Sequence, residues 1–311
     1  MIKDFFMPFV EIIKNYPEKF IVCVILAFVP TLAWLIIFEK HNPRKTPRIL
    51  ITFIVGMFSA VILLFYRHLW GDNVDLVFFS FKAQNFEENI NGIFTNQIVS
   101  AFFVFMSVGF LEEFLKHWVV KKTDHKIFES IDDVIELSIF AALGFAFLEN
   151  VRYFFDAAQN FGGQKLMSIF LVRSVFVTFI HILCSGIYGY FYGLAYFADP
   201  LLHRDHHKKW RDKIPDFFHK FFHFKTETVF KDEMITLGLL IAVFLHGIFD
   251  FLMHIDFSLG NFLGREIRLF FVILPVFLVF GFAFLSHLLT KKEDQLHFGK
   301  KMIVTKFSHS S

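Results

Sequence analysis

Runs of apolar residues recur along the whole chain and limit the folds that it can adopt. A helix needs about 20 apolar residues to cross the roughly 30 Å of hydrocarbon in a bilayer. About seven such runs can be read from the sequence, at 20–38, 49–66, 98–120, 134–155, 168–197, 235–253 and 267–289. A soluble domain of 311 residues, 55% of them hydrophobic, has too little interior to bury this much apolar surface. The sequence therefore predicts an all-α, polytopic bundle of about seven transmembrane helices.

Lysine and arginine are unevenly distributed among the connections between these runs. They gather after the first, third and fifth runs and in the tail that follows Leu289, and they are sparser in the other connections. Because positively charged loops stay in the cytoplasm, this alternation predicts an N-terminus outside and a C-terminus in the cytoplasm. Together with the runs, it divides the chain into an interfacial segment over 1–19, a transmembrane bundle over 20–289 and a basic cytoplasmic tail over 290–311.

Ionisable side chains interrupt four consecutive runs at depths where charge is costly. A charged group at the centre of a bilayer costs roughly 2.5–3.5 kcal/mol or more, so such residues face the bundle interior and mark functional sites. In chain order they are Glu112, Glu113, Glu149, His181 and His246. Because four successive helices each contribute such groups, the sequence predicts that these side chains share one water-filled pocket inside the membrane.

Helical spacing pairs some of these groups with polar neighbours. Residues four apart share a helix face, and three such pairs are present: Glu112–Lys116, Glu113–His117 and His246–Asp250. One interpretation makes Lys116 half of a structural ion pair whose ammonium reaches water at the cytosolic edge. Likewise, Asp250 either orients the imidazole of His246 or belongs to a hydrogen bond between packed helices. The spacing alone leaves both alternatives open.

Four short motifs in order resemble those of a known family. EEFLK (112–116), FAFLEN (145–150), His181 followed by SGIYGYFYG, and HGIFD (246–250) resemble the successive motifs of the PrsW family. These are intramembrane proteases related to the CAAX prenyl endopeptidases and the bacteriocin-processing Abi proteins. The resemblance covers roughly 30–253, and the turn EKHNPRKTPR is more basic than the corresponding loop of the family.

The resemblance implies an intramembrane endopeptidase in the bacterial inner membrane. Its substrate would be a membrane-anchored protein, and one role within the family is to release a transcription factor by cutting its membrane-bound inhibitor. Membrane lipid is the other expected partner, and no nucleic acid is expected. The implied catalytic residues are Glu112, Glu113, Glu149, His181 and His246, with Lys116 and Asn150 in support.

Two versions of the chemistry follow from this resemblance. In the first, His181 and His246 bind Zn²⁺ together with Glu149, Asp250 or both, and Glu112 or Glu113 is the base. In the second, a glutamate and a histidine activate water without a metal. Asn150 either donates to the oxyanion or bonds between helices. The sequence contains no HExxH motif that would require zinc.

Two other functions are compatible with deep acidic and imidazole groups. A proton-coupled transporter also uses such residues as a relay, although no internal repeat is visible in this chain. A non-catalytic membrane scaffold that retains the fold is the second alternative. The two cysteines, Cys23 and Cys184, lie inside apolar runs and are interpreted as small buried hydrophobic residues.

Overall fold

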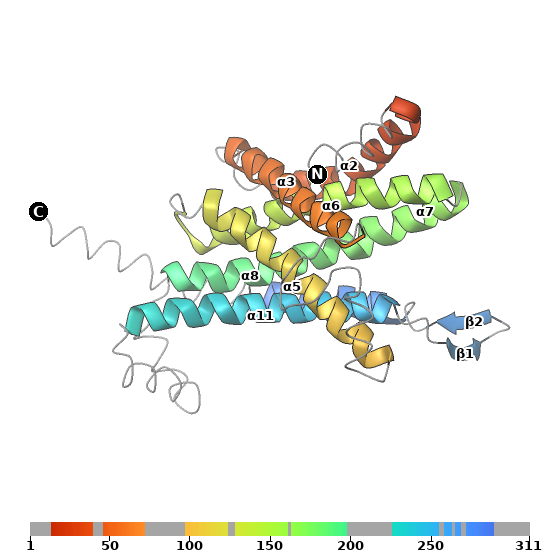
Figure 1. Cartoon of the computed structure of the whole chain (residues 1–311). Coiled ribbons are helices and arrows are strands. Elements are labelled where there is room, and N and C mark those ends of the chain that lie inside the picture. The colour runs from red at the N-terminus through yellow and green to blue at the C-terminus, as the bar shows by residue number, and fades with distance from the viewer. Residues whose placement is uncertain are drawn as a thin grey trace, which may run out of the picture.

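The structure is a computed structural model, and it is described here for the residues whose placement is defined. These are 14–39, 46–71, 97–123, 128–160, 163–197, 226–254, 258–262, 265–268 and 272–288. The helices of this part of the chain pack as a bundle (Figure 1). They are α2 (Pro17–Glu39), α3 (Thr46–Gly71), α5 (Gln97–Thr123), α6 (Ile131–Asn160), α7 (Gly163–Val172), η3 (Arg173–Val177), α8 (Thr178–Phe197), α11 (Thr226–His254) and a last helix, Val272–Leu288.

Three of these helical stretches are long and apolar enough to cross a membrane within the described residues. They are Pro17–Ile36, Leu166–Phe197 and Lys231–Met253. Shorter apolar helices cover Pro47–Leu63 and Val272–Leu288. The predicted helical membrane bundle is therefore confirmed as an architecture, while the number of spans and their orientation stay predictions.

The helix α6 forms the centre of the bundle. It packs against α8, α3 and α2, while α11 lies alongside α8 and is crossed by α5 (Figure 1). Its side chains from Leu137 to Leu143 are buried and form the core with α8. The helix begins with a capping box, because the amide of Asp133 donates to Ser130 Oγ (3.2 Å) and the Asp133 carboxylate accepts from the amide of Glu129 (3.0 Å).

Glycines permit unusually close helix crossings. A Cβ at Gly144 of α6 would lie 2.0 Å from the carbonyl oxygen of Phe53 in α3. Where α5 crosses α11, a Cβ at Gly109 would lie 3.0 Å from the backbone nitrogen of Gly247. Small residues let helix backbones approach in membranes, where packing replaces the hydrophobic drive for association. The crossing of α5 and α11 brings Glu113 and His246 into contact.

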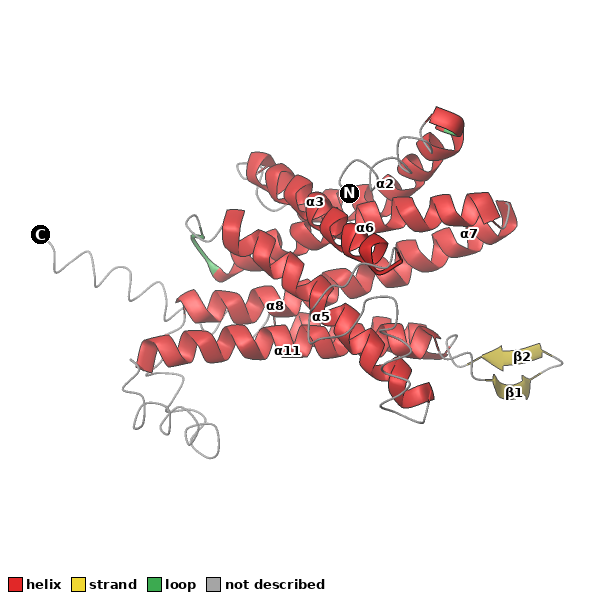
Figure 2. Ribbon diagram, viewed as in Figure 1, coloured by secondary structure: helices red, strands yellow, loops and turns green. Residues whose placement is uncertain are grey.

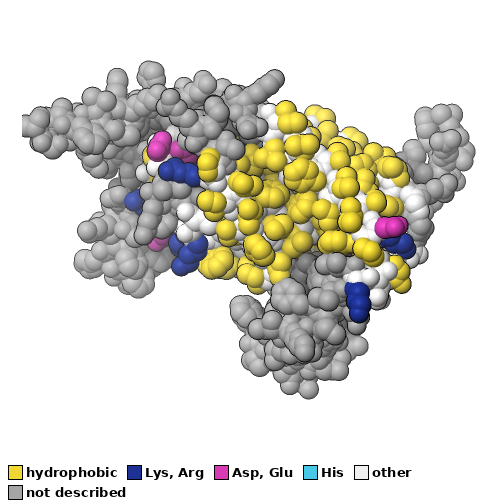
Figure 3. Space-filling view, turned by 90° about the horizontal axis from the view of Figure 1, so that it is seen from above, with side chains coloured by type: hydrophobic (Ala, Val, Ile, Leu, Met, Phe, Trp, Pro, Cys, Tyr) yellow, Lys and Arg dark blue, Asp and Glu magenta, His cyan; other side chains and the backbone are white. Residues whose placement is uncertain are grey.

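The outer surface of the bundle is apolar in a broad band. Large hydrophobic side chains such as Ile25, Phe58, Leu240 and Phe280 are 59%, 59%, 60% and 70% exposed. In Figure 3 this apolar band lies between charged side chains at its two ends. Such a contiguous exposed apolar surface is far larger than water-soluble monomers carry, so it is suited to contact with lipid.

Two strands qualify the all-α prediction. Strand β1 (Ser258–Phe262) pairs antiparallel with β2 (Arg265–Arg268), with Phe262 opposite Arg265 (Figure 2). The predicted seventh span began at 267, but Ile267 and Arg268 belong to β2, and the described helix covers Val272–Leu288. Of the other predicted segments, most of 1–19, the tail 290–311, the His-rich loop 199–212 and most of the loop 67–97 lie outside the described residues.

Candidate active site

Helix α5 presents two glutamates and a lysine to the interior of the bundle. Glu112, Glu113 and Lys116 are each only 2% exposed. The ammonium of Lys116 donates to Glu113 Oε1 at 2.7 Å, whereas Glu112 Oε2 lies 3.9 Å from it. One of the interpretations left open by the spacing pairs Lys116 with Glu112 on one helix face and extends its side chain to water. In the structure the ammonium turns inward and pairs more closely with Glu113, three residues away.

His246 of α11 faces both glutamates. Its Nδ1 lies 2.7 Å from Glu113 Oε1, and its Nε2 lies 3.5 Å from Glu112 Oε2 and 3.6 Å from Asp250 Oδ2. Glu113 Oε1 therefore interacts with Lys116 and His246 at once. Glu112 Oε2, in contrast, makes no hydrogen bond within the described part of the chain. The two adjacent glutamates thus have different surroundings.

His181 of α8 connects Lys116 with Glu149 of α6. Its Nδ1 lies 2.7 Å from Lys116 Nζ, and its Nε2 lies 3.1 Å from Glu149 Oε2. An ammonium can only donate, so Nδ1 accepts from Lys116 and Nε2 carries the proton that Glu149 accepts. The ring meets His246 edge-on, with ring centroids 5.0 Å apart. Four helices therefore converge on one buried polar cluster.

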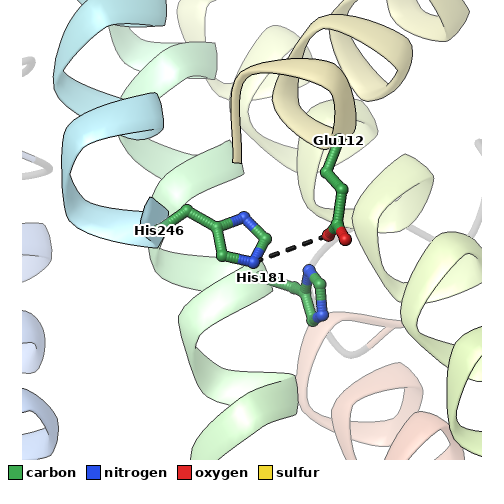
Figure 4. Close-up of side chains that lie close together, drawn as sticks. All are labelled: Glu112, His181 and His246. Atoms are coloured by element: carbon green, nitrogen blue, oxygen red, sulfur yellow. Dashed lines mark ion pairs between the residues drawn. The ribbon is translucent and has the colours of Figure 1, made fainter. Parts of the chain in front are cut away.

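The histidines and Glu112 lie around a common point (Figure 4). One ligand atom from each of Glu112, His181 and His246 lies within 4.8 Å of the others. A second group of this kind consists of Glu113, Cys184 and His246. Cys184 is fully buried and free, as predicted for a small hydrophobic residue, but its position beside the glutamates was not foreseen.

Comparison with known proteins identifies the family of this chain. The sequence pattern of the family described as PrsW family intramembrane metalloprotease matches residues 45–282, and so covers more than half of the chain. The chain belongs to the PrsW family. It is also 27% identical over 169 residues to "Protease PrsW" of Oceanobacillus iheyensis, an alignment that covers 54% of this chain and 58% of that protein. The chain thus matches little more than half the length of that relative. No solved structure matches it.

The metalloprotease description implies a metal, and the donor set of this PrsW family member fits one. Two imidazoles and a carboxylate are a common zinc ligand set. The orphaned Oε2 of Glu112 supplies an oxygen without a competing hydrogen bond in the described residues. Lys116 already contacts His181 Nδ1 at 2.7 Å, so a cation could be held at that nitrogen only if the lysine moved away. The residues therefore fit zinc in type and lie near one another, and binding at His181 Nδ1 would require Lys116 to move.

The structure distributes the other predicted residues around this cluster. Glu149 contacts His181, but it does not share the three-residue group with both histidines. Asp250 lies beside His246 with 26% of its side chain exposed. Asn150 donates to Thr178 Oγ1 at 3.3 Å, a bond between helices as described in one of its two predicted alternatives. His117, predicted to share a face with Glu113, interacts instead with the hydroxyl of Tyr188 at 3.3 Å.

One residue at the cluster was not among the candidates of the sequence analysis. Arg173 lies inside the predicted run over 168–197 and was not singled out, but its Nη2 lies 3.0 Å from Glu149 Oε2 and its Nε donates to Asn150 Oδ1 at 2.7 Å. The available signal was a lone arginine inside the apolar stretch 166–197. A charge in such a position needs a partner, and Glu149 on the preceding helix is that partner.

Proposed function

We propose that this protein is an intramembrane endopeptidase of the bacterial inner membrane that cuts a membrane-anchored protein within or near the bilayer. The observation that carries the proposal is the cluster itself. Five ionisable residues from α5, α6, α8 and α11 interact there although each residue as a whole is at most 8% exposed; they are Glu112, Glu113, Glu149, His181 and His246. Burial of such groups is unfavourable. Acid–base catalysis of peptide-bond hydrolysis is a function that requires them.

Glu112 is the proposed proton acceptor. Its Oε2 is buried, makes no hydrogen bond within the described residues and lies 3.5 Å from His246 Nε2, so a water beside this pair would donate to the carboxylate and be polarised toward attack. Glu113 is the proposed orienting carboxylate, because its Oε1 already accepts from Lys116 and faces His246 Nδ1. After attack, the proton held at Glu112 would pass to the leaving amine.

In the alternative, metal version of the proposal, zinc is the cofactor, and Glu112, His181 and His246 would hold it. When bound, it would supply Lewis-acid polarisation of the scissile carbonyl. In that version Glu112 is a ligand, whereas without a metal it is the base, so metal content decides between its two roles. Glu149 and Asp250, the carboxylates that the sequence analysis assigned to the metal, would then adjoin the two ligand histidines.

The cluster has one side that is more accessible than the rest. The side chains of Asp250, Arg173 and Glu149 are 26%, 11% and 10% exposed, whereas those of Glu112, Glu113 and His181 are 2%, 2% and 1% exposed. We propose that the substrate reaches the cluster from this side. The proposal includes about seven spans, an outside N-terminus and a cytoplasmic tail. The apolar helices and the apolar surface support a membrane bundle, and the distribution of lysine and arginine supports the orientation.

The test replaces site residues and follows a membrane protein that should be cut. Glu112→Gln, His181→Ala and His246→Ala should each leave the protein inserted and folded while an uncut protein accumulates in the membrane. Glu129→Gln, the same change at an exposed position, should process normally. The accumulating protein is identified by comparing the membrane proteomes of a deletion strain and its parent. Normal processing in all three site variants would remove the protease proposal.

A second measurement separates the two versions of the chemistry. The protein purified in metal-free buffer is analysed for bound zinc, and His246→Ala is analysed in the same way. About one zinc per chain that is lost in the variant supports the metal version. Full activity of a preparation that contains no zinc would assign Glu112 as a base.

A further inference from the structure

A short π-helical segment lies where α7 continues into α8. In η3 the backbone amide of Thr178 donates to the carbonyl of Arg173, five residues earlier, and the hydroxyl of Thr178 donates to the same carbonyl at 2.9 Å. Segments of this kind are rare and are frequently found at functional sites. In a regular α-helix, Arg173 and His181 would point about 80° apart, because eight residues exceed two turns by that angle. The wider turn of η3 takes up part of this rotation and brings both side chains toward α6.

The Arg173 guanidinium binds three residues of α6. It forms an ion pair with Glu149 Oε2 at 3.0 Å through Nη2, without hydrogen-bond geometry, donates to Asn150 Oδ1 at 2.7 Å through Nε, and lies 3.8 Å from the ring centroid of Tyr153. A planar guanidinium can satisfy several partners in fixed geometry, which a lysine ammonium cannot. Of these contacts, the ion pair is the one that reaches Glu149. The same oxygen of Glu149 accepts from His181 Nε2 at 3.1 Å.

The contacts therefore form a continuous series from η3 to α5. Arg173 holds Glu149, Glu149 accepts from His181 Nε2, and His181 Nδ1 accepts from Lys116. A carboxylate that accepts from one ring nitrogen determines which nitrogen keeps a lone pair and how the ring is oriented. In this protein the lone pair of His181 is directed toward Lys116 on α5, the helix that carries the glutamates.

We propose that Arg173 is a positioning residue of the site, which keeps Glu149 Oε2 against His181 Nε2 and thereby sets the tautomer and orientation of His181. This role rests on the proposed protease function, because it serves the same cluster. Arg152, on the neighbouring α6, offers a matched control. It pairs with Asp156 at 3.5 Å at the surface, where the two side chains are 42% and 55% exposed.

A spectroscopic experiment tests the proposal without any substrate. The purified protein carries ¹⁵N-labelled histidine, and the ring signals of His181 are assigned by their loss in His181→Ala. In the wild type and in Arg152→Ala, Nε2 should be the protonated nitrogen. In Arg173→Ala the two tautomers should both be populated, or the signals should move away from the wild-type positions. Unchanged His181 signals in Arg173→Ala would overturn the proposal.

A kinetic cycle then tests whether Arg173 acts through Glu149. The substrate is the membrane protein that accumulates in cells with Glu112→Gln, purified in detergent. Loss of a residue that orients a site residue from behind typically lowers activity or metal affinity 10- to 100-fold. We therefore expect Arg173→Ala to lower kcat by that factor and to leave KM within about twofold. Arg173→Lys, which keeps the charge, should recover part of kcat. In a Glu149→Gln background, Arg173→Ala should cause no further loss beyond about twofold, and Arg152→Ala should be unchanged in either background.

The outcomes separate this proposal from the protease function itself. If the losses of Arg173→Ala and Glu149→Gln multiply, or if only the melting temperature falls, Arg173 is a structural residue and the positioning role is wrong. If Arg173→Ala does not accumulate in the membrane, Arg173→Lys takes its place in both experiments. Wild-type kcat together with wild-type His181 signals in that variant would also refute the role. If Glu112→Gln, His181→Ala and His246→Ala all process normally, the protease function fails, and the ring signals still report on Arg173.

Discussion

The crossing of α3 and α6 makes a quantitative prediction about Gly144. An added Cβ would lie 2.0 Å from the carbonyl oxygen of Phe53 and 2.9 Å from the backbone nitrogen of Met57. Side-chain carbons essentially never come closer than 3.0 Å to such atoms, so Gly144→Ala requires the helices to separate locally by at least 1.0 Å. Both contacts are backbone atoms of a packed helix, so no side chain can simply rotate away.

The expected cost has two opposing parts. Alanine favours a helix over glycine by about 1 kcal/mol, while overpacking of a dense interior costs about 1–3 kcal/mol and occasionally more. Because the obstacle is backbone, the upper part of that range applies, and a net loss of about 2 kcal/mol is expected. The same shift moves Glu149, five residues along α6, relative to His181. A displacement of about 1 Å can cost roughly 100-fold in rate, so activity should fall far more than the amount of folded protein.

The assay measures unfolding and processing in the same preparations. Unfolding is followed by circular dichroism as detergent-solubilised protein is titrated with sodium dodecyl sulfate, and processing is followed in membranes. The control is Gly163→Ala, where an added Cβ meets no atom within 4 Å; it should be neutral or slightly stabilising. If Gly144→Ala were as stable and as active as Gly163→Ala, the close approach of α3 to α6 would be refuted.

Two further predictions concern the buried lysine and the cap of α6. Lys116→Met removes the ammonium from Glu113 and His181, so we expect lost processing and a loss of about 3 kcal/mol in stability; the exposed Lys122→Met should change stability by less than about 0.5 kcal/mol. Equal stability of the two variants, measured in the same titration, would contradict the buried ion pair. Ser130→Ala removes the acceptor for a first-turn amide of α6 and should cost about 1 kcal/mol with normal processing at permissive temperature. A thermal melt unchanged from wild type would show that the cap contributes nothing.

Much of the helical framework could be predicted because its signals are local. The predicted run over 134–155 lies within α6, and the run over 168–197 ends at the same residue as α8. Both predictions depend only on the length and apolarity of neighbouring residues. The strands β1 and β2 were missed because their five and four residues are too few to show a clear alternation of apolar and polar side chains. The assignment of Ile267 and Arg268 to a strand and not to the predicted seventh span was missed for the same reason.

The site was predictable as a set of residues but not as a set of contacts. Depth and charge identified the glutamates and histidines, because an ionisable group in an apolar run is costly wherever the helix lies. Spacing on one helix could not show that Lys116 prefers Glu113 to Glu112, since that choice depends on the position of His181 on another helix. Arg173 was overlooked because the π-helical turn that directs it toward α6 has no clear sequence signal.

The sequence by itself determined that this chain forms helices in a membrane, and it determined which side chains could not remain in lipid without partners. Both properties follow from the transfer free energies of consecutive residues, which do not depend on how the helices are arranged. Only the tertiary structure decided that Glu113 interacts with Lys116 and His246 while Glu112 Oε2 makes no hydrogen bond in the described part of the chain. That distinction arises from the helix crossings, where glycines allow the backbones to approach and where residues more than a hundred positions apart come within hydrogen-bonding distance.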